Sequence, residues 1–303
     1  MNEFENVNCL VCGENNYHNY SDKGQFNLPT HVVICKHCGF SYLNPRWSNE
    51  RYNAFYKNEY DDYYRPEVKS KYTYDVYLPI KNNLKRLDKF GYLKNQPENI
   101  IDIGCGMGDS LIYLKQQVFK TANYYAIEPS SFCQQHLSKN GIDLLSTDVN
   151  ADWSNGNENK FDVVIMRHVL EHFLDPIAVL KKAASILKKD GLLIIAVPNA
   201  KKPTKRLIKN YFRVVHVSYF SKTSLTNALS LSGLKPGVLL EGDEFDAYEL
   251  FCVAQKTNDQ LSVKFDKEEC QKQIEVYNQT KKLDFYYDFK ALVWKLINKV
   301  KSN

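Results

Sequence analysis

The chain has 303 residues, of which 44% are hydrophobic and 25% charged, and its formal net charge is +5. This composition predicts a folded globular protein with one large core and one or two small appendages. The longest purely apolar run, residues 192–198, is too short to span a bilayer. The mild positive charge allows an anionic substrate but does not by itself indicate a nucleic-acid binder.

Residues 1–45 carry two tight cysteine pairs, each followed by glycine: Cys9/Cys12 and Cys35/Cys38. Four thiolates on two such turns make a closed tetrahedral shell, so we predict a small zinc ribbon with a structural Zn²⁺. Iron, or unliganded thiols, are the alternatives. The first residues form no basic and then apolar leader, and paired thiols suit a reducing compartment, so we expect a cytoplasmic protein.

The ribbon contains only two basic residues, Lys23 and Lys36, so we expect a scaffold or substrate lid rather than a nucleic-acid reader. Residues 46–95 form a helical, tyrosine-rich connector, with helical spacing in Ile80, Leu84 and Leu87 and a looser fit at Phe90. Its eight crowded tyrosines favour packing over sugar stacking. They are Tyr52, Tyr56, Tyr60, Tyr63, Tyr64, Tyr72, Tyr74 and Tyr77.

Residues 96–256 alternate short apolar strands with amphipathic helices, which indicates βαβ units and a parallel sheet. The predicted strands are 99–103, 124–127, 142–145, 161–166 and 192–197. The predicted helices between and after them are 110–118, 131–139, 177–187 and 221–232. A final hairpin is predicted from residues 238–240 and 250–254.

A glycine-rich turn directly follows the first of these strands. Glycines let the chain turn sharply and let a ligand touch the backbone, and the next helix aims its free N–H groups at the turn. The spacing D-x-G-x-G-x-G differs from the G-x-G-x-x-G of nicotinamide enzymes. The expected binding residues are Asp102, Gly104, Cys105, Gly106 and Gly108.

Further ligand-binding candidates lie where the later strands end. Glu128, followed by Pro129, is placed to accept the hydroxyls of a ribose. Asp148 is expected to bind an exocyclic adenine amine while Val149 packs the ring, and Arg167 and His168 follow the fourth strand.

These motifs resemble the class I S-adenosylmethionine (SAM)-dependent methyltransferases over residues 99–256. The resemblance rests on the glycine spacing, Glu128, the segment Val169-Leu-Glu171-His172-Phe-Leu-Asp-Pro176, and Val197-Pro-Asn after the fifth strand. It implies an α/β, Rossmann-like seven-stranded sheet with one antiparallel strand, and SAM at the carboxyl edge. A nucleotide-binding Rossmann domain of another kind is the alternative.

The segment His168-x-x-Glu171-His172 also matches a zinc-peptidase signature. On a helix the two histidines would share a face, so metal binding is geometrically allowed. We disfavour it because the segment follows a strand of a βαβ series and no distant third ligand is apparent. His168 is expected at the mouth of the active site, and His172 as a packed helix residue.

A basic run follows the fifth strand, with six basic residues and no acid in 201–213. It is either a solvated face or an anion site, with candidates Lys201, Lys202, Lys205, Arg206 and Arg213. Next come His216, the candidate general base, and Tyr219, a candidate hydrogen-bond donor. A helix-capping histidine is the structural alternative for His216.

The cysteine pairs, the segment Leu43-Asn-Pro-Arg46 and His216-Val-Ser-Tyr-Phe-Ser resemble the zinc-containing C- and O-methyltransferases that act on nucleotide-linked sugars or surface-glycan precursors. The resemblance maps His216 to the histidine thought to act as base. The C-methyltransferases carry Tyr and Glu where Arg213 and Val215 stand here, so O-methylation stays open. A zinc-ribbon nucleic-acid methyltransferase and a non-catalytic SAM-binding scaffold are the competing functions.

Residues 257–303 are predicted to be a helical extension. Its last part has lysines on the helix and a phased apolar stripe apart from them. The stripe consists of Phe285, Phe289, Leu292, Val293, Leu296 and Val300. This stripe is expected to dock on the protein's own domain, with a partner subunit or an anionic membrane surface as alternatives.

Overall fold

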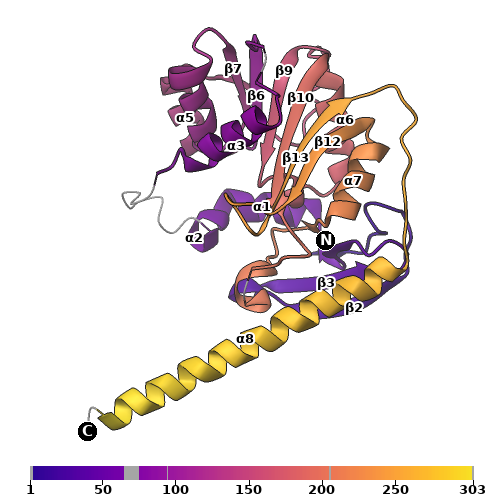
Figure 1. Ribbon diagram of the computed structural model, residues 1–303, viewed down its shortest axis with the longest axis vertical. Coiled ribbons are helices and arrows are strands. Elements are labelled where there is room, and N and C mark those ends of the chain that lie inside the picture. The colour runs from indigo at the N-terminus through magenta and orange to yellow at the C-terminus, as the bar shows by residue number, and fades with distance from the viewer. Residues whose placement is uncertain (1–2, 65–74, 94, 205, 302–303) are drawn as a thin grey trace.

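The computed structural model describes residues 3–64, 75–93, 95–204 and 206–301. Its centre is a seven-stranded sheet with the order β12-β13-β10-β9-β6-β7-β8 (Figure 1). The strands are β6 (Asn99–Ile103), β7 (Asn123–Ile127), β8 (Asp143–Ser146), β9 (Phe161–Arg167), β10 (Leu187–Pro198), β12 (Leu234–Glu241) and β13 (Glu249–Lys256). β13 alone runs antiparallel to its neighbours β10 and β12, whereas the other described pairings, β10–β9, β9–β6, β6–β7 and β7–β8, are parallel. The expected Rossmann-like sheet with one antiparallel strand is confirmed.

Helices cover both faces of this sheet (Figure 1). One face packs α3 (Leu78–Lys89), α4 (Asp109–Tyr113) with the π-helix η2 (Leu114–Val118), and α5 (Ser131–Lys139). The other face packs α6 (Pro176–Ile186) and α7 (Lys222–Leu231). Because both faces are covered, the central strands read as nearly continuous apolar runs rather than alternating ones.

The predicted βα elements are confirmed to within a few residues. α6 begins at Pro176, whose missing N–H costs nothing at a helix start, and Asp175 caps it by accepting from the N–H of Ala178. Ser221 caps α7 in the same way. The terminal hairpin is longer than predicted, because β12 and β13 pair from Leu234 and Lys256 to Glu241 and Leu250.

The cysteine-bearing ribbon is a second, four-stranded sheet with the order β11-β4-β3-β2. It comprises β2 (Tyr17–Lys23), β3 (Pro29–Cys35), β4 (Ser41–Leu43) and β11 (Ser218–Tyr219). β11 comes from the segment between β10 and α7, so the two sheets are tied by the chain that carries His216. The buried residues Cys35 and Phe40 belong to the same core cluster as α6 and α7, so the ribbon is packed into the sheet domain.

The connector begins with the short strand β5 (Arg46–Trp47), which pairs with β1 (Phe4–Glu5). It continues in α1 (Asn49–Asn58) and α2 (Tyr60–Tyr64). Tyr52 and Phe55 are buried against Trp47 and the valines of residues 214–217. Phe90, the loosest member of the predicted apolar stripe of α3, is 39% exposed. Tyr72 and Tyr74 lie outside the described residues.

After β13 the chain runs through non-helical residues 257–266 and a turn before α8 (Glu268–Lys301), so the predicted extension is helical only in its second part. α8 passes along β3 and then projects away from the body of the molecule (Figure 1). Among the described helices, none has the length and apolar character needed to cross a bilayer.

Candidate active site

The glycine-rich turn after β6 holds three glycines in the left-handed region, with φ of 72° at Gly104, 58° at Gly106 and 72° at Gly108. A Cβ on Gly104 would lie 2.4 Å from Cγ2 of Val169, and one on Gly108 would lie 2.3 Å from Cδ2 of Leu137. A Cβ on Gly106 would meet no described atom within 4 Å. Two glycines therefore permit close packing, and the middle one faces open space that a ligand can enter.

Two buried carboxylates lie at this turn, and one of them, Glu128, is hydrogen-bonded to it. Glu128, just beyond the end of β7, accepts from the N–H of Gly106 at 2.8 Å and from the N–H of Ser130 at 2.9 Å. Asp102 is 5% exposed within β6, and burial raises its pKa to about 8, although Arg167 acts in the opposite direction. Glu128 thus holds the turn in shape at the carboxyl edge of the sheet.

The remaining predicted cofactor residues lie at the same edge. Asp148 is exposed after β8, and its Oδ1 accepts from the N–H of Asn150 at 2.8 Å. Val149 is half-buried against the core. Pro129 is exposed and its carbonyl accepts from Gln134, while burial raises the pKa of the Cys105 thiol.

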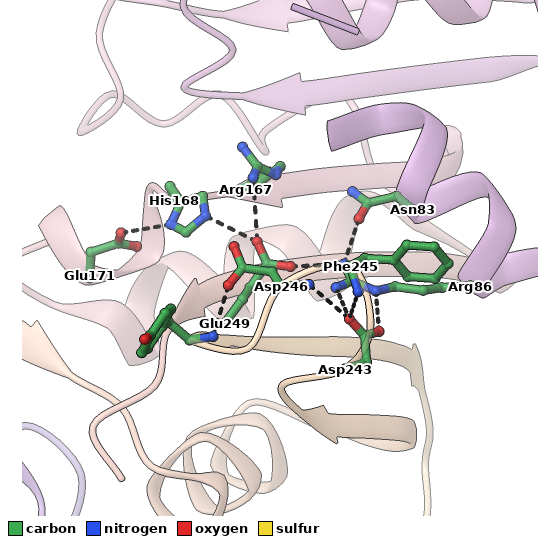
Figure 2. Close-up of polar contacts among 10 residues, drawn as sticks. Asn83, Arg86, Arg167, His168, Glu171, Asp243, Phe245, Asp246 and Glu249 are labelled. Atoms are coloured by element: carbon green, nitrogen blue, oxygen red, sulfur yellow. Dashed lines mark hydrogen bonds and ion pairs between the residues drawn. The ribbon is translucent and has the colours of Figure 1, made fainter. Parts of the chain in front are cut away.

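At the end of β9, His168 is held between two buried carboxylates (Figure 2). Its Nε2 lies 3.0 Å from Oε2 of Glu249, and its Nδ1 lies 3.6 Å from Oε1 of Glu171. Burial lowers the pKa of this imidazole, but the two carboxylates more than offset burial and raise the pKa to about 9. His168 has φ of 50°, a conformation uncommon for a residue with a side chain.

Sequence reasoning missed the ionic network behind His168. Glu249 also accepts from Arg86 on α3 at 2.8 Å, and Arg86 in turn contacts both carboxylate oxygens of Asp243 at 2.6 and 2.7 Å (Figure 2). Asn83 accepts from the same guanidinium at 3.0 Å. Arg86 is 3% exposed. The sequence signal that could have identified Arg86 as buried was its position among the core residues of α3, directly before Leu87.

A cavity of about 330 Å³ opens beside this edge. Its walls come from α2, from the segment His168–His172 after β9, from Pro198 at the end of β10 and from residues 210–216. Val169, inside that wall segment, is also the residue that Gly104 approaches. The glycine turn and the cavity are therefore neighbours.

His216 lines this cavity and is 7% exposed. Burial lowers its pKa well below the ordinary value, and His172 and Arg213 lower it further. Its Nδ1 is buried without a hydrogen-bond partner among the described residues. A neutral imidazole with an unused ring nitrogen beside a cavity can accept a proton from a bound ligand.

Glu171 and His172 complete a cluster with His216, because one ligand atom from each lies within 4.8 Å of the others. Glu171 is 1% exposed, and both of its carboxylate oxygens lack a hydrogen bond among the described residues. The sequence showed no distant ligand near the H-x-x-E-H segment, whereas the chain just before β11 places His216 beside Glu171 and His172; His168 is not a member of this cluster. The expectation of a helical segment fails, because only Leu170–His172 form a short 3-10 turn that excludes His168.

Tyr219 does not line the cavity. Its hydroxyl accepts from the N–H of Arg213 at 3.1 Å and lies 3.3 Å from the Arg213 carbonyl, and its ring packs on Tyr211 and Phe212. Burial raises its pKa well above the ordinary value. The structure thus places Tyr219 as a support for the loop that carries Arg213.

The basic run is dispersed rather than gathered into one site. Lys201 pairs with Glu269 at 3.2 Å, and Lys202 donates to the Glu241 carbonyl at 2.6 Å. Arg206 lines a different cavity, and only Arg213 of the described candidates lines the cavity of His216. Lys205 lies outside the described residues.

The four ribbon cysteines meet at one point. The Sγ atoms of Cys9 and Cys38 are 3.6 Å apart, those of Cys12 and Cys35 are 3.5 Å apart, and all four lie within 4.8 Å of one another. None forms a disulfide. Four sulfurs bound tetrahedrally to Zn²⁺ at about 2.3 Å would lie about 3.8 Å apart, so the donor set fits a structural zinc ion.

Among curated proteins, the chain is similar to ubiquinone biosynthesis O-methyltransferases. It is 28% identical to that of Haemophilus ducreyi over 138 residues, which cover 42% of this chain and 56% of the relative. It is 33% identical to that of Parvibaculum lavamentivorans over 131 residues, which cover 39% and 46%. The chain spans about half the length of the curated relatives it matches.

Solved structures are similar at low identity. The mitomycin 7-O-methyltransferase MmcR has a TM-score of 0.47 at 16% identity, with 60% of this chain and 54% of that chain covered. A complex of the Haloferax volcanii Trm112 methyltransferase activator with a putative methyltransferase has a TM-score of 0.49 at 15% identity, with 68% and 97% covered.

A family profile described as a methyltransferase domain matches residues 73–237, which run from within the connector to the middle of β12. The match spans more than half of the chain and includes the glycine turn, Glu128 and the wall segment with His168 and Glu171. With this match and the seven-stranded sheet together, the chain belongs to the methyltransferase-domain family and has the fold of the class I SAM-dependent methyltransferases.

Proposed function

We propose that the chain is a SAM-dependent methyltransferase that methylates a hydroxyl group of an acceptor bound in the His216 cavity. The observation that carries the proposal is the shared wall of the two sites: Val169 contacts the glycine turn, while His168 and Glu171 beside it line the cavity. A donor at Gly106 and an acceptor in the cavity would therefore face each other. SAM, when bound, supplies the methyl group as an electrophile.

The chain's own residues would bind both reactants and accept the proton that the acceptor hydroxyl loses. Glu128 and the backbone of the turn bind the nucleoside part of the donor. His216, kept neutral by burial, would take the proton of the acceptor hydroxyl at a ring nitrogen, so that the oxygen could accept the methyl group that SAM would supply. His168, cationic below about pH 9, fixes Glu171 and Glu249 in place.

For the acceptor we propose a sugar derivative that carries an anionic group. Arg213 offers a guanidinium for the anion, and the tyrosines of α2 offer ring faces and hydroxyls that suit a sugar. The relatives are named for ubiquinone biosynthesis. A methylation screen should therefore compare nucleotide sugars with phenolic acceptors, with mass detection of the product. Turnover of phenols alone would contradict the sugar assignment.

The substitution His216→Ala tests the base. We expect SAM affinity to stay within about threefold of wild type and turnover to fall by roughly 10²–10⁴-fold, the usual contribution of a positioned general base. His136→Ala, on α5, is the matched control and should keep its rate. Because the pKa of His216 lies well below its ordinary value, wild-type turnover should persist below pH 6.5 and fall only in more acidic solution.

The experiment also needs a chelation measurement, because a metal ion could be held by the cluster of Glu171, His172 and His216. If these residues held a catalytic metal ion, a chelator would remove the activity of the wild-type protein and a divalent cation would restore it. Turnover that resists chelation, together with the loss in His216→Ala, supports the base. Near-normal turnover of His216→Ala contradicts both roles.

We also propose that Cys9, Cys12, Cys35 and Cys38 hold one structural zinc ion. The support is their mutual distance and the absence of an open position for a substrate in a shell of four thiolates. Metal analysis should give one zinc per chain, and Cys38→Ser should lose it and lower the melting temperature. Cys270→Ser, a buried cysteine outside the cluster, should retain the metal. A metal-free wild type with unchanged stability would contradict the proposal.

A further inference from the structure

The helix α8 has two halves with different surroundings. In its first half Cys270, Gln273 and Tyr277 are buried against the ribbon, and Gln273 donates to the Ala200 carbonyl at 2.7 Å. In its second half the described apolar side chains are exposed, and the helix extends beyond the body of the molecule (Figure 1). Their exposed fractions are 53% at Leu283, 75% at Phe285, 50% at Tyr286, 57% at Phe289 and 67% at Trp294.

The charge of the helix changes at the same place. Residues 268–280 contain three glutamates and one lysine, whereas residues 281–301 contain six lysines and two aspartates. One of those aspartates, Asp284, already accepts from the backbone N–H groups of Arg206 and Leu207. The second half therefore combines exposed aromatic side chains with a net positive charge of +4.

A cavity of about 260 Å³ lies where α8 leaves the body. Three basic residues line it, Arg206 and Lys209 from the segment after β10 and Lys281 from α8, next to the apolar Leu207 and Phe285. The acid Asp284 also lines it, and its carboxylate is engaged by the backbone N–H groups of Arg206 and Leu207. The segment that contributes Arg206 and Lys209 continues through Asn210 and Arg213, which line the cavity of His216. This second cavity is suited to a phosphate group carried on an apolar chain.

We propose that the second half of α8 and this basic cavity dock the protein on an anionic lipid membrane, with the lipid phosphates in the cavity. Aromatic side chains at the headgroup level and lysines that reach anionic lipids are what interfacial helices use. Charge complementarity favours this occupant over a second copy of the chain, because two halves of net charge +4 would repel each other. The association is with the surface, since α8 is not apolar enough to span a bilayer.

The test is flotation of the full chain with lipid vesicles. Vesicles of phosphatidylcholine with roughly 30% phosphatidylglycerol should bind the protein, and binding should fall with added salt, whereas pure phosphatidylcholine should bind it at least about tenfold more weakly. Phe285→Ser combined with Phe289→Ser and Trp294→Ser should lose binding, and so should Lys282→Glu combined with Lys290→Glu. Phe132→Ser, which is 56% exposed on α5, and Lys189→Glu are the matched controls and should bind normally.

Several outcomes would overturn the proposal. Equal binding of the variants and the wild type would show that α8 is not the docking surface. Absence of binding to anionic vesicles would exclude the membrane. A concentration-dependent dimer of the wild type, measured by sedimentation without vesicles and lost in the triple variant, would assign the surface to a second copy. The variants change side chains outside the core, so circular dichroism should show wild-type folding in each.

Discussion

The glycine turn and the cavity beside His216, which we propose as the donor edge and the acceptor cavity, are neighbours, yet they are built in different ways. The donor edge is the end of one strand and the turn that follows it, Asp102 to Gly108, completed by Glu128 just beyond the end of the next strand. The acceptor cavity draws its walls from α2, the segment after β9, the end of β10 and residues 210–216. The first is a local structure, and the second exists only in the folded protein.

This difference sets what each site can tolerate. The donor edge presents backbone groups, so its shape depends on glycine dihedral angles that a single residue change can destroy. The acceptor cavity presents side chains whose positions depend on a buried ionic network that reaches back to α3. A substitution in the donor edge should therefore reduce donor binding. A substitution in the network behind the acceptor cavity should instead reduce stability and disturb the geometry of the cavity.

The largest effect is expected at the donor edge. Gly106→Arg should abolish SAM binding measured by calorimetry, because its side chain would fill the open space at Gly106. Gly156→Arg is the matched control, since Gly156 also has a positive φ, of 75°, and open space around it. Undiminished SAM binding by Gly106→Arg would remove the turn as the donor site.

An intermediate effect is expected behind the acceptor cavity. Arg86→Met leaves Asp243 and Glu249 without their shared cation, so the free energy of unfolding in urea should fall by about 3–5 kcal/mol. SAM affinity of the folded protein should change little. Lys85→Met, on an exposed neighbouring position, is the control. A loss below about 1 kcal/mol would show that the network is not important for stability.

The smallest effect is a pH dependence of stability from His168. Its folded pKa of about 9 lies above the unfolded value near 6.5, so its contribution is complete below pH 6.5 and is lost as pH rises through 9. The free energy of unfolding should fall more steeply over this window in the wild type than in His168→Gln. His136→Gln should behave as the wild type does. Parallel curves for wild type and His168→Gln would contradict the ion pairs with Glu171 and Glu249.

Sequence reasoning worked best where a residue's role follows from its immediate neighbours. The glycine spacing, Glu128 and the alternation of strands and helices were sufficient to predict the sheet and its donor edge, and the two cysteine pairs predicted a four-thiol cluster that the structure confirms. For the basic run the sequence left a solvated face and an anion site as alternatives. Lys201 and Lys202 are engaged by residues of α8 and β12, which no local pattern could reveal.

By itself, the sequence determined the fold class, the turn at Gly106 and the cysteine cluster, because strand periodicity, glycine dihedral freedom and thiolate spacing act over a few residues. Only the tertiary structure decided that His216 lies beside Glu171 and His172, that Arg86 and Glu249 share a buried ion pair, and that α8 docks with one half alone. These contacts join residues far apart in the chain. They depend on which surfaces can be buried together, and that is a property of the whole packed molecule.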